Sequence, residues 1–215
     1  MKYTTIIFDL DGTLLNTLAD LAAATNHALA EHKLPQRTTD EVRLFVGNGI
    51  RKLIERAVPA DTPAELQEEV FASFNKYYKQ HCADSTRPYE GVPQLLQQLR
   101  AAGCRTAIVS NKADYGVQAL AKQYFDGQLD AACGERAGIA KKPAPDMLLA
   151  IMQQLNAKPA STIYIGDSDT DIATASNAGV ACIGACWGFR GRAFLEAHGA
   201  KLLAENVGDI WELIK

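Results

Sequence analysis

Two carboxylates, Asp9 and Asp11, stand one residue apart directly behind the apolar run TTIIF. An apolar run of this kind predicts a buried strand, and Gly12 ends it with a turn. Neighbouring like charges repel each other, and each must lose water if the site is closed. Two acids at the end of a core strand therefore indicate a bound cation, a bound proton or a chemical function.

Further polar residues follow later apolar runs. Ser110 and Asn111 end the run CRTAIVSN. Asp167 ends STIYIGD, and Asp171 lies four residues later on the same face of the following helix. Lys142 lies in the loop AGIAKKPAPD, before another helix. Taken singly, each has an ordinary explanation as a turn residue, a helix cap or a solvated charge.

The order of the predicted elements brings these residues together. From Pro88 onward, apolar strands alternate with amphipathic helices, which predicts a parallel sheet covered on both faces. Residues 17–86 show helical spacing and no strand. We expect a doubly wound, Rossmann-like α/β core of residues 1–15 and 88–215, with a helical cap domain inserted at residues 16–87. Ligands of such sheets bind at the carboxyl ends of the strands, where the polar residues above fall.

Acids that converge at one sheet edge need compensation. Two unit charges about 4 Å apart cost roughly 4 kcal/mol at a surface-like dielectric. A hard dication with oxygen ligands offsets this cost, and Mg²⁺ with retained waters and phosphate oxygens is the natural choice. Lys142, the Ser110 hydroxyl and backbone N–H groups of the turns would bind the remaining phosphoryl oxygens. The predicted site contains what phosphoryl transfer needs.

Composition narrows the partners and the compartment. The net charge of the 215 residues is −3, so no basic field attracts nucleic acid or an anionic membrane. The five cysteines are odd in number and form no zinc pattern, which predicts reduced thiols. No segment reads as a signal peptide or reaches the length of a membrane span. We expect a cytoplasmic protein, monomer or dimer, that acts on a small phosphorylated metabolite.

The motifs DLDGT, SN, KPAPD and GDSDTD stand in an order that resembles the haloacid dehalogenase-like hydrolase superfamily, over essentially the whole chain. The helical insertion resembles the small cap of one subgroup. The segments RLFVGNGIRKLIERA, PYEGV and CWGFR resemble phosphoglycolate phosphatases. The resemblance implies a phosphatase for a small phosphomonoester, with 2-phosphoglycolate first. Inorganic pyrophosphate, a sugar phosphate or a nucleotide remain alternative substrates. A β-phosphoglucomutase-like enzyme is a further alternative, although Gly166 stands where such mutases typically carry Glu.

The same resemblance assigns roles to individual residues. Asp9 would be the nucleophile that forms an aspartyl-phosphate, and Asp11 would protonate the leaving group and then activate water. Mg²⁺ would be held by Asp9, the Asp11 backbone carbonyl and Asp167, with Asp171 acting through water or behind the ligands. The residues implied to hold the phosphoryl group are Thr13, Ser110, Asn111 and Lys142.

Substrate selection would fall to the cap. In GNGIRK (47–52), the Asn48 amide, the Arg51 guanidinium and backbone N–H groups could bind the carboxylate of phosphoglycolate. The alternative is that Arg51 is a solvated residue in the first turn of a helix. Asn16-Thr17 stands where many relatives carry Asp-Ser, so contacts at the cap entrance are not carried over.

Three other classes fit the residues less well. A haloacid dehalogenase proper would lack the second acid, Asp11. A signalling receiver domain would phosphorylate an aspartate far from the first strand and would lack the helical insertion. A dinucleotide-binding domain would need a G-x-G-x-x-G motif after the first strand, which this sequence does not have.

Overall fold

The computed structural model describes residues 1–215, which divide into two units. The core unit comprises Met1–Leu15 and Pro88–Lys215, and the helical unit comprises Asn16–Arg87. The chain passes between them through the short strands β2 (Leu15–Asn16) and β3 (Arg87–Pro88), which pair with each other.

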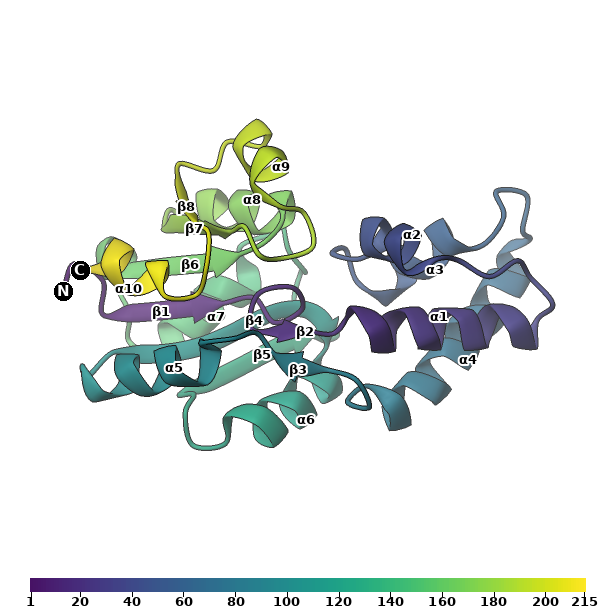
Figure 1. Cartoon of the computed structure of the whole chain (residues 1–215), viewed down its shortest axis with the longest axis horizontal. Coiled ribbons are helices and arrows are strands. Elements are labelled where there is room, and N and C mark those ends of the chain that lie inside the picture. Colours follow the sequence, from purple (N-terminus) through teal and green to yellow (C-terminus); the bar gives the residue numbers. More distant parts are fainter. The chain divides into compact units, whose positions relative to one another are not determined.

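The core unit is built on one six-stranded sheet in the order β5-β4-β1-β6-β7-β8, and every strand pair in it is parallel (Figure 1). The strands of this sheet are β1 (Thr5–Phe8), β4 (Arg105–Ala113), β5 (Ala131–Glu135), β6 (Thr162–Gly166), β7 (Ala181–Ala185) and β8 (Leu202–Ala204). The helices of the unit are α5 (Val92–Ala101), α6 (Asp114–Phe125), α7 (Asp146–Gln154), α8 (Asp169–Asn177), α9 (Arg192–Ala197) and α10 (Asp209–Ile214), with a short 3₁₀ turn at Pro159–Ser161.

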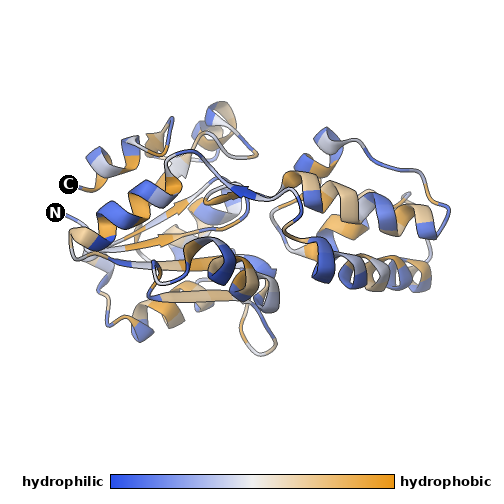
Figure 2. Cartoon of the chain, turned by 60° about the horizontal axis from the view of Figure 1, so that its bottom comes forward, coloured by the Kyte–Doolittle hydropathy of each residue, from blue (hydrophilic) through white to orange (hydrophobic).

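Helices cover the sheet on both faces, which explains the continuous apolar runs of its strands. All residues of β1 and β6 are buried. Helices α7 and α8 pack over Ile7, Val109 and Tyr164 on one face, and Figure 1 shows α5 on the opposite side of the sheet from α7. In Figure 2 the strands are mainly apolar, whereas polar and apolar residues alternate along the helices. The predicted doubly wound α/β core is confirmed.

Strand β1 lies at the point where the strand order of the sheet reverses. It pairs with β4 on one side and with β6 on the other. After β1 the chain adds β4 and β5 on one side of β1, and then adds β6, β7 and β8 on the other side. In such sheets a crevice opens beyond the carboxyl ends of the strands at this switch point. We therefore expect a ligand site at the carboxyl ends of β1, β4 and β6.

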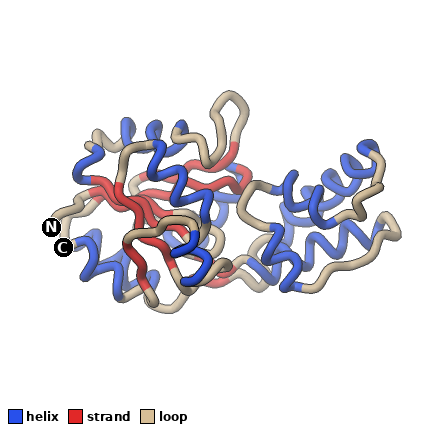
Figure 3. Tube along the Cα trace, turned by 90° about the horizontal axis from the view of Figure 1, so that it is seen from above, coloured by secondary structure: helices blue, strands red, loops and turns tan.

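The helical unit contains no strand between residues 17 and 86, as Figure 3 shows. Its helices are α1 (Leu18–Glu31), α2 (Thr39–Phe45), α3 (Ile50–Ala57) and α4 (Ala64–His81). Thr38 and Glu41 form a capping box at the start of α2. The unit has a small apolar core of its own, with Leu29, Phe74 and Tyr78 almost completely buried. None of the helices in either unit combines the length and the apolar character that crossing a membrane requires.

Candidate active site

The carboxyl end of β1 presents two carboxylates on a tight turn. Beyond Asp9 the chain winds around the carbonyl oxygen of Leu10, which accepts hydrogen bonds from three successive backbone N–H groups. Gly12 permits this turn because its φ is +84°, a left-handed conformation that costs other residues roughly 1–2 kcal/mol. The turn leaves Asp9 and Asp11 at the same edge of the sheet.

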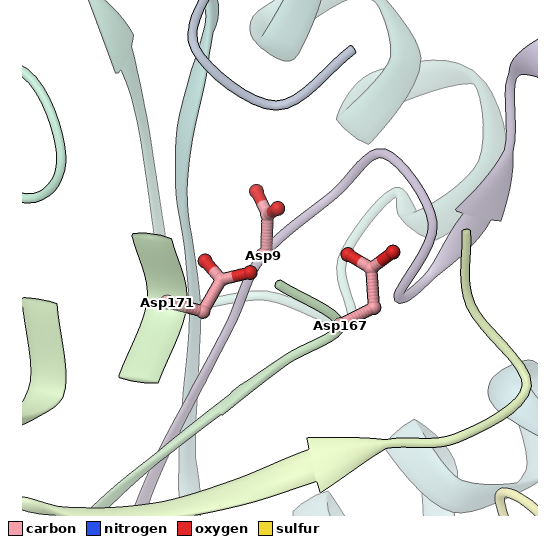
Figure 4. A group of neighbouring side chains, drawn as sticks. All are labelled: Asp9, Asp167 and Asp171. Atoms are coloured by element: carbon pink, nitrogen blue, oxygen red, sulfur yellow. The ribbon is translucent and has the colours of Figure 1, made fainter. Parts of the chain in front are cut away.

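Strand β6 and helix α8 add two further carboxylates. Asp167 directly follows β6, and Asp171 lies in the first turn of α8. Ser168 and Asp171 form a capping box: the Ser168 Oγ accepts from the Asp171 N–H at 3.3 Å, and Asp171 Oδ2 accepts from the Ser168 N–H at 3.1 Å. One carboxylate oxygen from each of Asp9, Asp167 and Asp171 lies within 4.8 Å of the others, and Figure 4 shows the three side chains together at the strand ends.

A buried lysine balances part of this negative charge. Lys142 Nζ lies 2.7 Å from Asp171 Oδ1, 2.9 Å from Asp9 Oδ1 and 3.0 Å from the Tyr164 hydroxyl. Burial lowers the pKa of Lys142, but the carboxylates of Asp171 and Asp9 outweigh it and raise this pKa above its ordinary value. An ammonium group has three N–H donors. Tyr164 and Asp171 accept hydrogen bonds from Lys142, whereas Asp9 Oδ1 lies beside it as an ion-pair partner without good hydrogen-bond geometry.

The carboxylates carry more negative charge than Lys142 neutralises. Burial raises the pKa of Asp9 to about 7, with Lys142 opposing the shift and Asp171 and Asp11 adding to it. Burial also raises the pKa of Asp167 well above its ordinary value, and the charges of Asp171 and Asp9 contribute to this. The site therefore favours the binding of a proton or a cation.

The donor set fits a hard divalent cation. Asp9 Oδ1 is buried and accepts no hydrogen bond of good geometry, although Lys142 lies 2.9 Å away. Asp171 differs, because Lys142 and Tyr164 donate to its Oδ1 and Ser168 donates to its Oδ2. Asp9 and Asp167 thus suit direct ligation, and Asp171 suits a supporting role behind the ligands. A set of oxygen donors is what Mg²⁺ prefers.

The loop after β7 holds Asp167 from another side. The Phe189 N–H donates to Asp167 Oδ2 at 2.7 Å, and the Trp187 indole donates to the Thr13 carbonyl at 3.0 Å. At Gly188, an added Cβ would lie only 2.2 Å from the Asp167 Cβ. The Thr13 hydroxyl donates to Asp167 Oδ1 at 3.5 Å, at the long limit of a hydrogen bond. Thr13, implied above as a phosphate ligand, is directed at Asp167 in this arrangement.

The end of β4 differs from the predicted strand, which stopped at Asn111. The strand continues to Ala113, and its pairing with β5 shifts in register after Val109. Such a bulge redirects side chains, and residues 110–112 are all buried. The Asn111 amide donates to the Lys142 carbonyl at 3.0 Å, so one implied phosphate ligand fixes the backbone of another.

Lys112 is a site residue for which the sequence offered no prediction. Its Nζ lies 3.1 Å from Asp11 Oδ1 and 3.3 Å from Asp11 Oδ2. Lysine is among the residues least often buried, so a lysine after a Ser-Asn pair carries no signal of burial. The one available clue was its place in the sequence, because it directly follows Ser110 and Asn111 at the end of a predicted strand.

Asn48 and Arg51, expected to select the substrate, have partners within the helical unit. The Arg51 guanidinium is paired with Glu68 and lies 4.4 Å from the centre of the Phe71 ring. Asn48 Oδ1 accepts from the Arg56 guanidinium at 2.8 Å. A substrate carboxylate bound by Arg51 would have to compete with Glu68.

Known proteins resemble this chain over most of its length. A family model described as haloacid dehalogenase-like hydrolase matches residues 6–185. A protein named phosphoglycolate phosphatase from Aquifex aeolicus (strain VF5) is 32% identical over 189 residues, which cover 86% of this chain and 85% of that protein. A protein of the same name from Pseudomonas putida (strain KT2440) is 34% identical over 209 residues, which cover 94% of this chain and 76% of that protein.

Solved structures also resemble this chain over its whole length. The crystal structure of a protein from Lactobacillus delbrueckii subsp. bulgaricus, provisionally named phosphoglycolate phosphatase, matches with a TM-score of 0.95 and 34% identity. The match covers 100% of this chain and 99% of that one. A structure described as a predicted phosphoglycolate phosphatase, from Haemophilus somnus 129PT, matches with a TM-score of 0.93 and 28% identity, and covers 100% and 99% of the two chains.

Proposed function

Since the chain belongs to the haloacid dehalogenase-like hydrolases, we propose that it is a Mg²⁺-dependent phosphatase whose substrate is a small phosphomonoester, 2-phosphoglycolate. One observation carries the proposal. Asp9, Lys142 and Asp171 are joined by ion pairs, with Asp167 beside them and Asp11 two residues from Asp9. This group offers a nucleophile, a proton-transfer residue, a cationic clamp and metal ligands, which are the parts that phosphoryl transfer requires.

Asp9 is the proposed nucleophile. One of its carboxylate oxygens attacks phosphorus, the bond between phosphorus and the ester oxygen breaks, and an aspartyl-phosphate forms. Asp11 gives its proton to the departing alkoxide. Water then attacks the same phosphorus, Asp11 accepts a proton from that water, and the bond to Asp9 breaks. Inorganic phosphate leaves, and both aspartates return to their starting states.

Lys142 is the proposed clamp for the phosphoryl group. Its ammonium is paired with Asp9 and Asp171, so it lies beside the nucleophilic carboxylate. A phosphoryl oxygen can take the place of Asp9 as its acceptor once the Asp9 oxygen is bound to phosphorus. The Ser110 hydroxyl and the Asn111 amide, both from the end of β4, are the further proposed ligands of this group.

The residues proposed to hold Mg²⁺ are Asp9, Asp167 and the backbone carbonyl of Asp11. When bound, the ion would neutralise the crowded carboxylates and the phosphoryl oxygens. Asp171 keeps Lys142 and the start of α8 in place. The Phe189 N–H fixes Asp167 Oδ2, whereas Asp167 Oδ1 accepts only the long 3.5 Å contact from the Thr13 hydroxyl and would bind the ion.

The choice of substrate rests on the relatives named phosphoglycolate phosphatase, at 32% and 34% identity. Inorganic pyrophosphate, sugar phosphates and nucleotides are the competing substrates. Gly166 counts against a mutase, because a Cβ at this position would lie 2.3 Å from the Asp171 Cγ. A glutamate there would require Asp171 to move away from Lys142.

A phosphate-release screen tests the proposal. The protein is incubated with 2-phosphoglycolate, pyrophosphate, sugar phosphates and nucleotides, each with Mg²⁺ and each with excess EDTA. We expect the highest kcat/KM for 2-phosphoglycolate and no turnover with EDTA. Asp9→Asn is the matched control, since it changes one atom and removes the nucleophile. Turnover that persists in Asp9→Asn, or a clear preference for another substrate, would contradict the corresponding part of the proposal.

A further inference from the structure

A second buried lysine of the core unit, Lys112, contacts Asp11, the residue that we assign to proton transfer. The Lys112 ammonium lies between the two carboxylate oxygens of Asp11, at 3.1 and 3.3 Å. The Lys112 side chain is 2% exposed and that of Asp11 is 14% exposed. A buried ammonium is costly unless a partner compensates it, so this contact is unlike a mobile surface ion pair.

Local backbone features build this contact. The pairing of β4 with β5 shifts in register between Val109 and Ala113, and residues 110–112 are buried. Gly116, in the first turn of α6, leaves room for the aliphatic part of Lys112, since an added Cβ would lie 3.3 Å from the Lys112 Cε. Glycine inside a helix is less stable than alanine by roughly 0.5–1 kcal/mol. The fold thus accepts a less favourable helix residue at the place where Lys112 passes.

The two buried lysines of the site serve different aspartates. Lys142 is paired with Asp9 and Asp171, whereas Lys112 is paired with Asp11. We propose that Lys112 is a positioning residue for proton transfer, which holds the Asp11 carboxylate in the orientation that receives a proton from the attacking water. This inference rests on the proposed acid–base role of Asp11. Lys112 itself touches no reacting atom in this scheme.

The substrate p-nitrophenyl phosphate distinguishes a positioning role of Lys112 from a structural role and from direct substrate binding. Its leaving group departs without a proton, so formation of the aspartyl-phosphate, which kcat/KM reports, should depend little on how Asp11 is oriented. Hydrolysis of the intermediate does require Asp11. Lys112→Met should therefore lower kcat by about 10- to 100-fold and lower KM in proportion. The fraction of enzyme trapped as phosphoenzyme by acid quenching should rise.

Two controls accompany this variant. Lys122→Met removes a lysine from an exposed position of α6 and should change neither kcat nor KM. Asp11→Asn, measured in parallel, should show a loss in kcat that is at least as large. In the Asp11→Asn background, Lys112→Met should add little further loss, because both changes affect one function.

The outcomes separate the possibilities. Equal losses in kcat and kcat/KM without trapped phosphoenzyme would show a merely structural role, and a raised KM would show direct substrate binding; either result overturns the inference. If Asp11→Asn leaves kcat unchanged, the proposed catalytic role of Asp11 fails. If Asp11→Asn is impaired and Lys112→Met is not, only the positioning role fails. Should Lys112→Met not fold, Lys112→Gln replaces it with the same readouts, because a neutral amide removes the ammonium charge and keeps a polar group at the site.

Discussion

Replacing Gly188 by alanine should weaken Mg²⁺ binding although it removes no ligand. The added Cβ would lie 2.2 Å from the Asp167 Cβ and 2.5 Å from the Gly12 carbonyl oxygen, distances that real atoms do not tolerate. The neighbouring Phe189 N–H, which donates to Asp167 Oδ2 at 2.7 Å, must shift with the loop. Asp167 would therefore lose both its position and the donor that orients it.

The expected loss of Mg²⁺ affinity follows from the role of the Phe189 N–H, which orients Asp167. Loss of a group that orients a metal ligand typically costs 10- to 100-fold in metal affinity. The half-saturating Mg²⁺ concentration of the phosphatase reaction should rise by about this factor. Overpacking a buried site typically costs about 1–3 kcal/mol, so the free energy of unfolding should fall by a similar amount. At saturating Mg²⁺, kcat should recover in large part.

The assay is a titration of activity against Mg²⁺, together with a thermal unfolding curve. Gly191→Ala is the matched control in the same loop. Its φ of +75° strains an alanine, but nothing lies within 4 Å of the added Cβ. It should lower the unfolding free energy by about 1 kcal/mol and leave the Mg²⁺ dependence unchanged. If Gly188→Ala and Gly191→Ala show the same Mg²⁺ dependence, Gly188 does not support Asp167 and the reasoning is refuted.

Four other changes have expected outcomes. Asp11→Asn should slow turnover of 2-phosphoglycolate by about 10²–10⁴-fold, and an unchanged rate would remove its proton-transfer role. Asp167→Ala should raise the Mg²⁺ concentration needed for half-maximal activity, and an unchanged titration would remove it from the ligands. Arg51→Ala should raise KM for 2-phosphoglycolate far more than for p-nitrophenyl phosphate if Arg51 binds the carboxylate, and equal effects would exclude this. In metal-free protein, burial raises the pKa of Asp9 from 3.8 to about 7, so the folded state binds this proton more tightly than the unfolded state. The free energy of unfolding should then fall as pH rises from 3.8 to about 7 and level off above that range, and Mg²⁺ should raise Tm more at pH 8 than at pH 5; a Tm gain independent of pH would contradict this.

The alternation of strands and helices after Pro88 was sufficient to predict the doubly wound α/β fold. Each apolar run is long enough for its period to be read, and each helix carries a start or stop signal. The strands β2 and β3 were not predicted, because two residues are too few for any period. The end of β4 was placed at Asn111 because polar residues begin there, whereas its backbone pairing continues to Ala113 through a bulge.

The gathering of Asp9, Asp167, Asp171 and Lys142 could be anticipated, because parallel strands bring their carboxyl ends to one edge. Their partners could not. Tyr164 reads as one more core residue of STIYIGD, yet its hydroxyl contacts both Lys142 and Asp171. Such contacts join side chains far apart in the sequence, and nothing in the residue types points from one to the other.

Trp187, Gly188 and Lys112 illustrate the same limit of sequence reasoning. The first two stand in CWGFR, which resembles a family segment but has no spacing that links it to Asp167. Lys112 lies 101 residues from the aspartate that it contacts. Side-chain partners of this kind follow from the packing of the finished fold, whereas strand ends follow from the topology alone.

The central place of β1 also has a consequence for how the chain is made. Thr5–Phe8 is synthesised well before its two neighbours in the sheet, which are Arg105–Ile108 and Thr162–Ile165. One edge of this buried, apolar strand therefore cannot pair before residue 108 has been made, and the other cannot pair before residue 165. Pairings of such sequence separation form slowly and leave the early strand open to aggregation. Nascent chains that stop before β6 should thus depend on chaperones, and Asp9 should gain its complete surroundings only when residue 171 has been added.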